Sequence, residues 1–268
     1  MKILHNARIY TLNTEQPIAE AIVIDENPPH RGRILAVGDF DSLKAQFSGA
    51  GLQDMDGRVI MPGLMDAHIH LKHLALGLNK VNCVTNTRQE CLQRVADRVN
   101  ETAPGKWVQG HGWNQNEWTS GFGNKQELDQ VSPNNPVYLS ASSLHAGWAN
   151  SLALEAAGIR KDTPDPPNGE IQRDADGEAT GILFEAAMGL VVDAIPQPSQ
   201  KEIKQSIHDA QPYLWQIGLT SVHDYDRRPC FVALQELHQE EKLGIRVVKT
   251  IPVDLLSEAV ALGLHTGY

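Results

Sequence analysis

Two histidines separated by a single residue are the strongest chemical feature of this sequence. His68 and His70 end the string PGLMDAHIH at residues 62–70. Side chains alternate between the two faces of an extended strand, so both imidazoles project from the same face. Neutral imidazoles are good ligands for a divalent ion, and such an ion lowers the pKa of its bound water to about 7 and polarises a carbonyl group. The pair therefore predicts that the two imidazoles can share one divalent ion.

The elements that must position this pair follow from the hydrophobic pattern. Apolar runs that alternate with helical patterns are typical of βα units and a parallel sheet. Thr87 and Glu90 form a capping-box pattern before a helix predicted at about 88–102. The same pattern at Ser199 and Glu202 begins a second helix, and Pro212 predicts a kink or an early end of that helix. The predicted strands are 60–67, 107–111, 137–141, 219–223 and 245–251.

The number of strands bears on the completeness of the fold. Five strands are fewer than the eight that a closed (β/α)₈ barrel of the TIM type needs. Residues 1–60 are short apolar pieces between polar turns, which predict a small β meander. Residues 160–182 are rich in Pro, Gly and Asp, which predicts an inserted loop and hairpin, either a wall of the site or a surface excursion. We therefore expect a fragment of a longer protein.

Composition limits the class of protein. The net charge of −10 disfavours nucleic acid and anionic membranes as partners. No apolar signal segment and no window of 18 apolar residues is present, so a cytoplasmic protein without a membrane span is expected. The three cysteines lack the spacing of a disulfide framework or a zinc ribbon. They are predicted to be ordinary thiols.

The string PGxxDAHxH resembles the opening of the barrel in the amidohydrolase superfamily. Four later segments resemble its family 3 branch, which includes N-substituted formamide deformylases. These segments are GHGWNQNEW at 110–118, SLHAGWANSLAL at 143–154, NGEI at 168–171 with TGILFEAA at 180–187, and GLTSVHD at 218–224. The resemblance implies that residues 1–60 are the N-terminal part of a small β-sandwich and that residues 61–268 are the first part of the barrel.

The resemblance also implies roles for individual residues. His68 and His70 would bind the metal, most often zinc. Glu185 would be a further metal ligand or bridge, although a glutamate after an apolar strand also commonly begins a helix or lies in solvent. The general-base aspartate would lie beyond Tyr268, so this fragment alone is expected to be inactive.

Several side chains are candidates for binding the substrate. His145 follows a predicted strand, on the face where such barrels build their sites. Trp113 and Trp118 could form a pocket for an apolar substituent. Asp224 could bind substrate, orient His223 or cap the next helix. His111 and His223 are interpreted as structural, and no role is assigned to six others: His5, His30, His73, His208, His238 and His265.

The predicted function is hydrolysis of a carbon–nitrogen bond in an amide or formamide-type small molecule by metal-activated hydroxide. Deamination of a heterocyclic amine on the same barrel is the enzymatic alternative. A truncated, inactive metal-binding chain is the alternative of a different class. The oligomeric state is left open, with a homo-oligomer compatible with the sequence.

Overall fold

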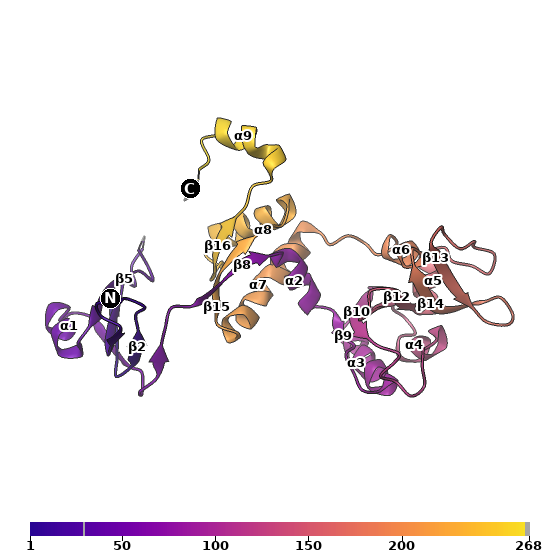
Figure 1. Cartoon of the computed structure of the whole chain (residues 1–268), viewed down its shortest axis with the longest axis horizontal. Helices are drawn as coiled ribbons and strands as arrows, with labels where there is room; N and C mark the ends of the chain where they lie inside the picture. The colour runs from indigo at the N-terminus through magenta and orange to yellow at the C-terminus, as the bar shows by residue number, and fades with distance from the viewer. Residues whose placement is uncertain (29, 266–268) are drawn as a thin grey trace. The chain divides into compact units, whose positions relative to one another are not determined.

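The computed structural model of the chain describes residues 1–28 and 30–265 (Figure 1). The chain divides into two compact units. The first contains Met1–Ala67, Leu214–His223 and Ile245–Val247, and the second contains the remaining residues. Each sheet is described below by itself. Tyr268, the predicted last residue of the barrel portion, lies outside the described residues.

Two small sheets form the N-terminal region. One has the strand order β5-β4-β1-β6 and the other the order β3-β2-β7. Apolar residues of both sheets, among them Ile9 and Ile22, pack in one cluster. The strands are β1 (Lys2–His5), β2 (Arg8–Tyr10), β3 (Ile18–Ala19), β4 (Ala21–Ile24), β5 (Ile34–Gly38), β6 (Gly51–Asp54) and β7 (Val59–Ile60).

This arrangement is not the predicted meander. Strand β1 pairs in parallel with β6, and β2 pairs in parallel with β7, whereas a meander joins sequential antiparallel neighbours. The helix α1 (Phe40–Gln46) lies between β5 and β6 in the chain, and Asp39 caps its first turn. Every residue of β6 is exposed. The strand therefore lacks the alternation of buried apolar and exposed polar residues by which a strand is recognised in a sequence.

A six-stranded sheet of order β13-β14-β12-β11-β10-β9 forms the largest sheet of the structure. The predicted strands at 107–111 and 137–141 are confirmed as β10 and β11, which pair in parallel with each other, and β10 pairs in parallel with β9. Strands β12, β14 and β13 continue the sheet with antiparallel pairings. The strands are β9 (Val81–Asn82), β10 (Val108–Trp113), β11 (Val137–Ala141), β12 (Ala146–Ala149), β13 (Gly169–Arg173) and β14 (Ala179–Glu185).

The segment rich in Pro, Gly and Asp therefore contributes to this sheet. Strands β13 and β14 form a hairpin, and β14 also pairs with β12. Four helices belong to this region, and the predicted helix at about 88–102 is confirmed as α3, with Thr87 accepting the Glu90 N–H. The helices are α3 (Arg88–Asn100), α4 (Lys125–Val131), α5 (Ser151–Ala156) and α6 (Ala187–Val192).

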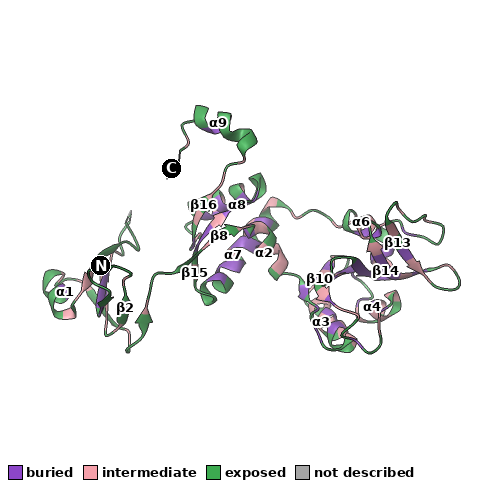
Figure 2. Ribbon diagram, viewed as in Figure 1, coloured by how far each residue is buried: buried purple, intermediate pink, exposed green. Residues whose placement is uncertain are grey.

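Three tryptophans form the centre of the core on one side of this sheet. Trp113 and Trp148 are fully buried, and Trp118 is 3% exposed. Their ring centres are 5.9–6.4 Å apart. The indole N–H groups of Trp113, Trp148 and Trp118 donate to the backbone carbonyls of Leu139, Asn124 and Thr85 respectively. Such partners satisfy the polar end of a buried indole. Figure 2 shows buried residues on this sheet and almost complete exposure of α9.

A three-stranded sheet of order β16-β15-β8 carries the histidine pair. Strands β8 and β15 run in the same direction, because Leu64 N–H donates to Gly218 O and Tyr225 N–H donates to Ile69 O. The predicted strands at 60–67, 219–223 and 245–251 are present with shifted bounds. The elements are β8 (Leu64–Ile69), α2 (Leu71–Leu78), α7 (Gln200–Gln216), β15 (Leu219–Asp224), α8 (Arg228–Gln239), β16 (Arg246–Lys249), the 3₁₀ turn η1 (Val253–Leu255) and α9 (Leu256–Ala261).

Helix α7 does not end early at Pro212, as one reading of the sequence predicted. The helix continues to Gln216. Proline lacks the N–H that would bond the carbonyl four residues before it, which is that of His208. The side-chain amide of Gln211 donates to this carbonyl at 3.2 Å. A neighbouring side chain thus replaces the missing donor.

Within residues 1–28 and 30–265, no helix combines the length and the apolar character that crossing a membrane requires. The strands of these residues form four open sheets, and the fold is of the mixed α/β type. The incomplete (β/α)₈ barrel and the β-sandwich stay predictions.

Candidate metal site

The structure places His68 and His70 side by side at the end of β8. His68 lies near the end of the strand, and His70 is the residue that precedes α2. Their ring centres are 5.7 Å apart with an interplanar angle of 70°. His68 stacks on Tyr225 with ring centres 4.0 Å apart, which fixes the plane of its imidazole. Both imidazoles are exposed, so a ligand from solvent can reach them.

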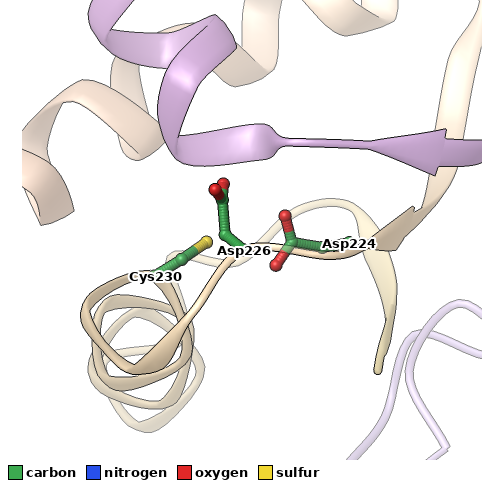
Figure 3. Close-up of side chains that lie close together, drawn as sticks. All are labelled: Asp224, Asp226 and Cys230. Carbon is green, nitrogen blue, oxygen red and sulfur yellow. The ribbon is translucent and has the colours of Figure 1, made fainter. Parts of the chain in front are cut away.

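Asp226 links this pair to the start of α2. Its Oδ2 accepts the Lys72 N–H at 2.6 Å. Its Oδ1 lies 3.4 Å from His70 Nδ1 and 3.6 Å from His73 Nε2. The carboxylate is almost completely buried, whereas the two imidazoles are more than half exposed. Figure 3 shows the Asp226 carboxylate directed at the ribbon that leads into α2.

Asp224 caps the same helix from the end of β15. Its Oδ1 accepts the Leu71 N–H at 2.9 Å, and its Oδ2 lies 2.9 Å from Lys249 Nζ. Burial by itself would raise the pKa of Asp224, but the Leu71 N–H and the Lys249 ammonium together hold that pKa below its ordinary value. Two carboxylates thus satisfy N–H groups of the first turn of α2, where a helix lacks internal acceptors and favours negative charge.

Lys249 fixes the turn that carries these two carboxylates. Its ammonium donates to the backbone carbonyls of Asp224, at 3.2 Å, and of Asp226. Thr250 also donates to the Asp224 carbonyl, through its hydroxyl at 2.8 Å and its N–H at 3.1 Å. The lysine side chain is only 14% exposed, so these contacts operate largely outside solvent. Charge-assisted bonds of this kind are stronger than neutral ones.

A buried group of possible ligand atoms lies next to the histidine pair. One ligand atom from each of Asp224, Asp226 and Cys230 lies within 4.8 Å of the others (Figure 3). Burial and the two neighbouring carboxylates raise the pKa of the Cys230 thiol, so it stays protonated. The carboxylate oxygens already accept Leu71 N–H and Lys72 N–H, and Lys249 supplies the positive charge. This group is therefore a structural support and not the better metal site.

The exposed imidazoles fit a divalent ion better. Zinc and similar ions are bound by neutral imidazole nitrogens at about 2.0–2.1 Å, and two rings at this spacing can both reach one ion. Metal-binding histidines commonly face a carboxylate through their second nitrogen, as His70 faces Asp226. His68 and His70 would hold the ion, and further ligands would complete its coordination.

His145, the residue before β12, meets Glu185 at the end of β14. His145 Nδ1 lies 3.0 Å from Glu185 Oε1, and the Glu185 N–H donates to His145 O at 3.1 Å. Both side chains are more than half exposed. Glu185 has a φ of +47°, a left-handed conformation that is uncommon for residues other than glycine. Strain of this kind is often found at functional sites. Roles of Glu185 in metal binding and of His145 in substrate binding stay predictions.

The other predicted substrate residues have little or no exposed surface. Trp113 and Trp118 are core residues, and Asp224 is fully buried with both oxygens engaged. Their contact with substrate stays a prediction, and none of the three residues is more than 3% exposed. The sequence reasoning missed Asp226 and gave no role to His73. The spacing of His73 three residues after His70 and the DxD pattern of Asp224 and Asp226 could have identified both.

Comparison with known proteins decides the family. The sequence model that describes the amidohydrolase family matches residues 51–267 of this chain. The chain belongs to the amidohydrolase family. This confirms the family 3 branch that the motifs predicted.

Individual relatives match over most of this chain. It is 35% identical over 228 residues to LONG AFTER FAR-RED 3 of Arabidopsis thaliana, a match that covers 84% of this chain and 38% of that protein. It is 33% identical over 228 residues to the N-substituted formamide deformylase of Arthrobacter pascens, covering 82% of this chain and 41% of the relative. The crystal structure of an uncharacterized metal-dependent hydrolase from Pyrococcus furiosus matches with a TM-score of 0.70 and 26% identity, over 98% of this chain and 52% of that one. The chain thus spans about two fifths to one half of the length of these proteins.

Proposed function

We propose that this chain forms part of a metal-dependent amidohydrolase that cleaves a carbon–nitrogen bond in a small amide or formamide. The observation that carries the proposal is the pair of exposed imidazoles of His68 and His70, one of which faces the buried carboxylate of Asp226. The N-substituted formamide deformylase among the relatives supports the substrate class. The similarity to a metal-dependent hydrolase supports the divalent ion, for which zinc is our choice.

In this proposal the residues of the chain have distinct tasks. A divalent ion, when bound, supplies an activated water and polarises the scissile carbonyl. His68 and His70 hold the ion. Tyr225 fixes the orientation of the His68 ring by stacking on it, and Asp226 faces Nδ1 of His70. Glu185 and His145 are proposed as further ligand and substrate contact. The relatives are longer than this chain. In the proposal, the remaining strands of a (β/α)₈ barrel and the general base lie in a segment that corresponds to their additional residues. A cytoplasmic location is part of the proposal.

Metal content tests the ligand assignment. We expect purified protein to retain about one equivalent of zinc or a similar ion per chain, and the double variant His68→Ala, His70→Ala to lose it. His30→Ala is the control, because this histidine lies in an exposed turn of the N-terminal region. Equal metal content in the double variant and the control, measured by elemental analysis, would eliminate the assignment.

A substrate screen distinguishes the proposed reaction from its alternatives. Because the general base is proposed to lie outside this chain, the screen uses a protein in which the chain is continued to the length of its relatives. That protein should hydrolyse N-formyl and N-acyl amines in a metal-dependent way if the amidohydrolase proposal is right. Release of ammonia from heterocyclic amines alone would favour a deaminase instead. Metal binding without turnover of either class in that longer protein would favour an inactive metal-binding protein.

A further inference from the structure

One carboxylate oxygen faces two imidazoles through chemically different nitrogens. Asp226 Oδ1 lies 3.4 Å from Nδ1 of His70 and 3.6 Å from Nε2 of His73. The two ring centres are 5.9 Å apart, with an interplanar angle of 78°. Two rings set at a steep angle to each other thus place different nitrogens near the same oxygen.

The chemistry of a neutral imidazole gives this arrangement a consequence. A neutral ring carries one proton on either Nδ1 or Nε2, and an ionised carboxylate only accepts hydrogen bonds. The nitrogen that faces the carboxylate is thus the one that holds the proton, and the other nitrogen keeps its lone pair. One carboxylate oxygen can accept from two donors, since it has two lone pairs.

The carboxylate cannot easily turn away from the rings. Its second oxygen accepts the Lys72 N–H at 2.6 Å, and Lys249 donates to the Asp226 backbone carbonyl. The Lys249 ammonium and the Asp224 carboxylate pair with each other at 2.9 Å. The side chain of Asp226 is 3% exposed, so water competes little for its oxygens.

We propose that Asp226 is a positioning residue that sets opposite tautomers in two neighbouring histidines. His70 carries its proton on Nδ1 and presents the lone pair of Nε2, which is the form required of a metal ligand at that nitrogen. His73 carries its proton on Nε2 and keeps the lone pair of Nδ1. The tautomers follow from Asp226 alone, whereas their value for metal binding rests on the proposed function.

Nitrogen NMR of the histidine side chains tests the tautomers directly. The whole chain, labelled with ¹⁵N-histidine, is measured without metal at a pH of about 8, above the ordinary imidazole pKa of about 6.5. Long-range ¹H–¹⁵N correlations distinguish protonated from unprotonated ring nitrogens, and His70→Gln and His73→Gln assign the signals. We expect the Nδ1–H form for His70 and the Nε2–H form for His73. The reverse assignment in either ring would overturn the proposal, whatever any variant shows.

Two substitutions separate positioning from simple support of the fold. Asp226→Asn keeps an oxygen for the Lys72 N–H but presents an NH₂ group to the rings, so the His70 tautomer should change to Nε2–H. Asp224→Asn is the matched control, because Asp224 also caps α2 but faces neither imidazole, and there the tautomers should stay as in the wild type. An unchanged His70 tautomer in Asp226→Asn, or an equal change in both variants, would contradict the inference.

Titration with Co²⁺, followed by its visible absorption, distinguishes this inference from the proposed function. Loss of a residue that orients a metal ligand typically weakens metal binding 10- to 100-fold, and we expect about this loss in Asp226→Asn. Equal Co²⁺ affinity in the wild type and Asp226→Asn would refute the positioning of His70 while leaving the metal site intact. If the wild type binds no Co²⁺, the proposed function fails, and the tautomers in the NMR spectra still decide the inference.

Discussion

The carboxylate of Asp224 accepts the backbone N–H of Leu71 at 2.9 Å, although the two residues are 153 positions apart in the sequence. The same carboxylate pairs with Lys249. Two strands and the first turn of α2 therefore meet at one fully buried side chain. A contact of this kind holds the exit of β8, and with it the position of His70.

Removal of this carboxylate should cost more stability than any surface ion pair. Asp224→Ala leaves the Leu71 N–H and the Lys249 ammonium without their partner, and breaking a buried pair on one side typically costs about 3–5 kcal/mol. Asp224→Asn keeps an acceptor for Leu71 and should cost less. Lys161→Ala is the control, since its pair with Glu178 is more than half exposed on the lysine side and 3.8 Å long. Urea unfolding of the three variants checks this order, and equal losses for Asp224→Ala and the control would contradict it.

Gly63 should not tolerate a side chain. A Cβ atom there would lie 2.1 Å from Thr220 Oγ1 and 2.3 Å from Thr220 Cγ2. We expect Gly63→Ala to destabilise the chain by about 1–3 kcal/mol, as overpacking typically does. Thr220→Ala should recover part of that loss in a double-mutant cycle, because it removes the two closest clashing atoms and leaves only Thr220 Cβ, at 2.7 Å. Gly49→Ala is the control, since a Cβ atom at Gly49 would have nothing within 4 Å and the φ of this residue is not positive; a loss there as large as at Gly63 would refute the steric explanation.

The pair of Gln211 and Pro212 should show energetic coupling. Gln211 is almost completely buried, and its amide bonds the carbonyls of His208 and Lys242 and the N–H of Gly244. Gln211→Met leaves these groups without their partner, at a cost of about 1–3 kcal/mol for each that stays unsatisfied. The cost should be smaller in a Pro212→Ala background, because alanine supplies the N–H that His208 O lacks. Additive losses in thermal or urea unfolding would show that Gln211 does not compensate for the proline.

Tyr138 should make stability depend on pH in the alkaline range. Burial raises the pKa of Tyr138 to about 12, and within the described residues its hydroxyl has no hydrogen-bond partner. The unfolded chain ionises near the ordinary pKa of about 10, so the free energy of unfolding should fall as pH rises from 10 to 12. Two pKa units correspond to about 2.7 kcal/mol.

Tyr138→Phe should remove this part of the pH dependence. It should also leave stability at neutral pH unchanged or higher, because an unsatisfied buried hydroxyl is lost. The measurement is the difference in unfolding free energy between wild type and variant from about pH 8 to about pH 11, an interval that spans the ordinary tyrosine pKa. A difference that does not change over this interval would contradict the raised pKa of Tyr138.

Local patterns predicted the elements that depend on local chemistry. The capping residue Thr87 located the start of α3, and apolar runs located β10, β11 and β15. The HxH spacing placed two imidazoles together before any tertiary information was available. These features follow from hydrogen bonds and side-chain alternation within one segment, which the sequence carries directly.

Features that depend on distant partners were not predictable in the same way. Strands β12 and β14 show no alternation of apolar and polar residues, because most of their residues are buried on both faces of the sheet. Trp113 was interpreted as a pocket residue, although it packs in the core. In the sequence, Asp226 is only a polar residue shortly after β15. Its role as an acceptor for the first turn of α2 is visible only in the folded structure, where it accepts the Lys72 N–H. The carbonyl of His208, which Pro212 leaves without a backbone donor, is bonded by the side chain of Gln211, which a propensity scale ranks only as one more good helix former.

The cap of α2 by residues far along the chain also sets an order of events during synthesis. His68 and His70 leave the ribosome well before Asp224 is made, 153 residues after Leu71. At about 5–20 residues per second, the interval is roughly 8–30 s. During this time neither Asp224 nor Asp226 can accept the N–H groups of the first turn of α2. The cap that positions His70 therefore forms only after residues 224–226 have been made and have folded onto the first turn of α2.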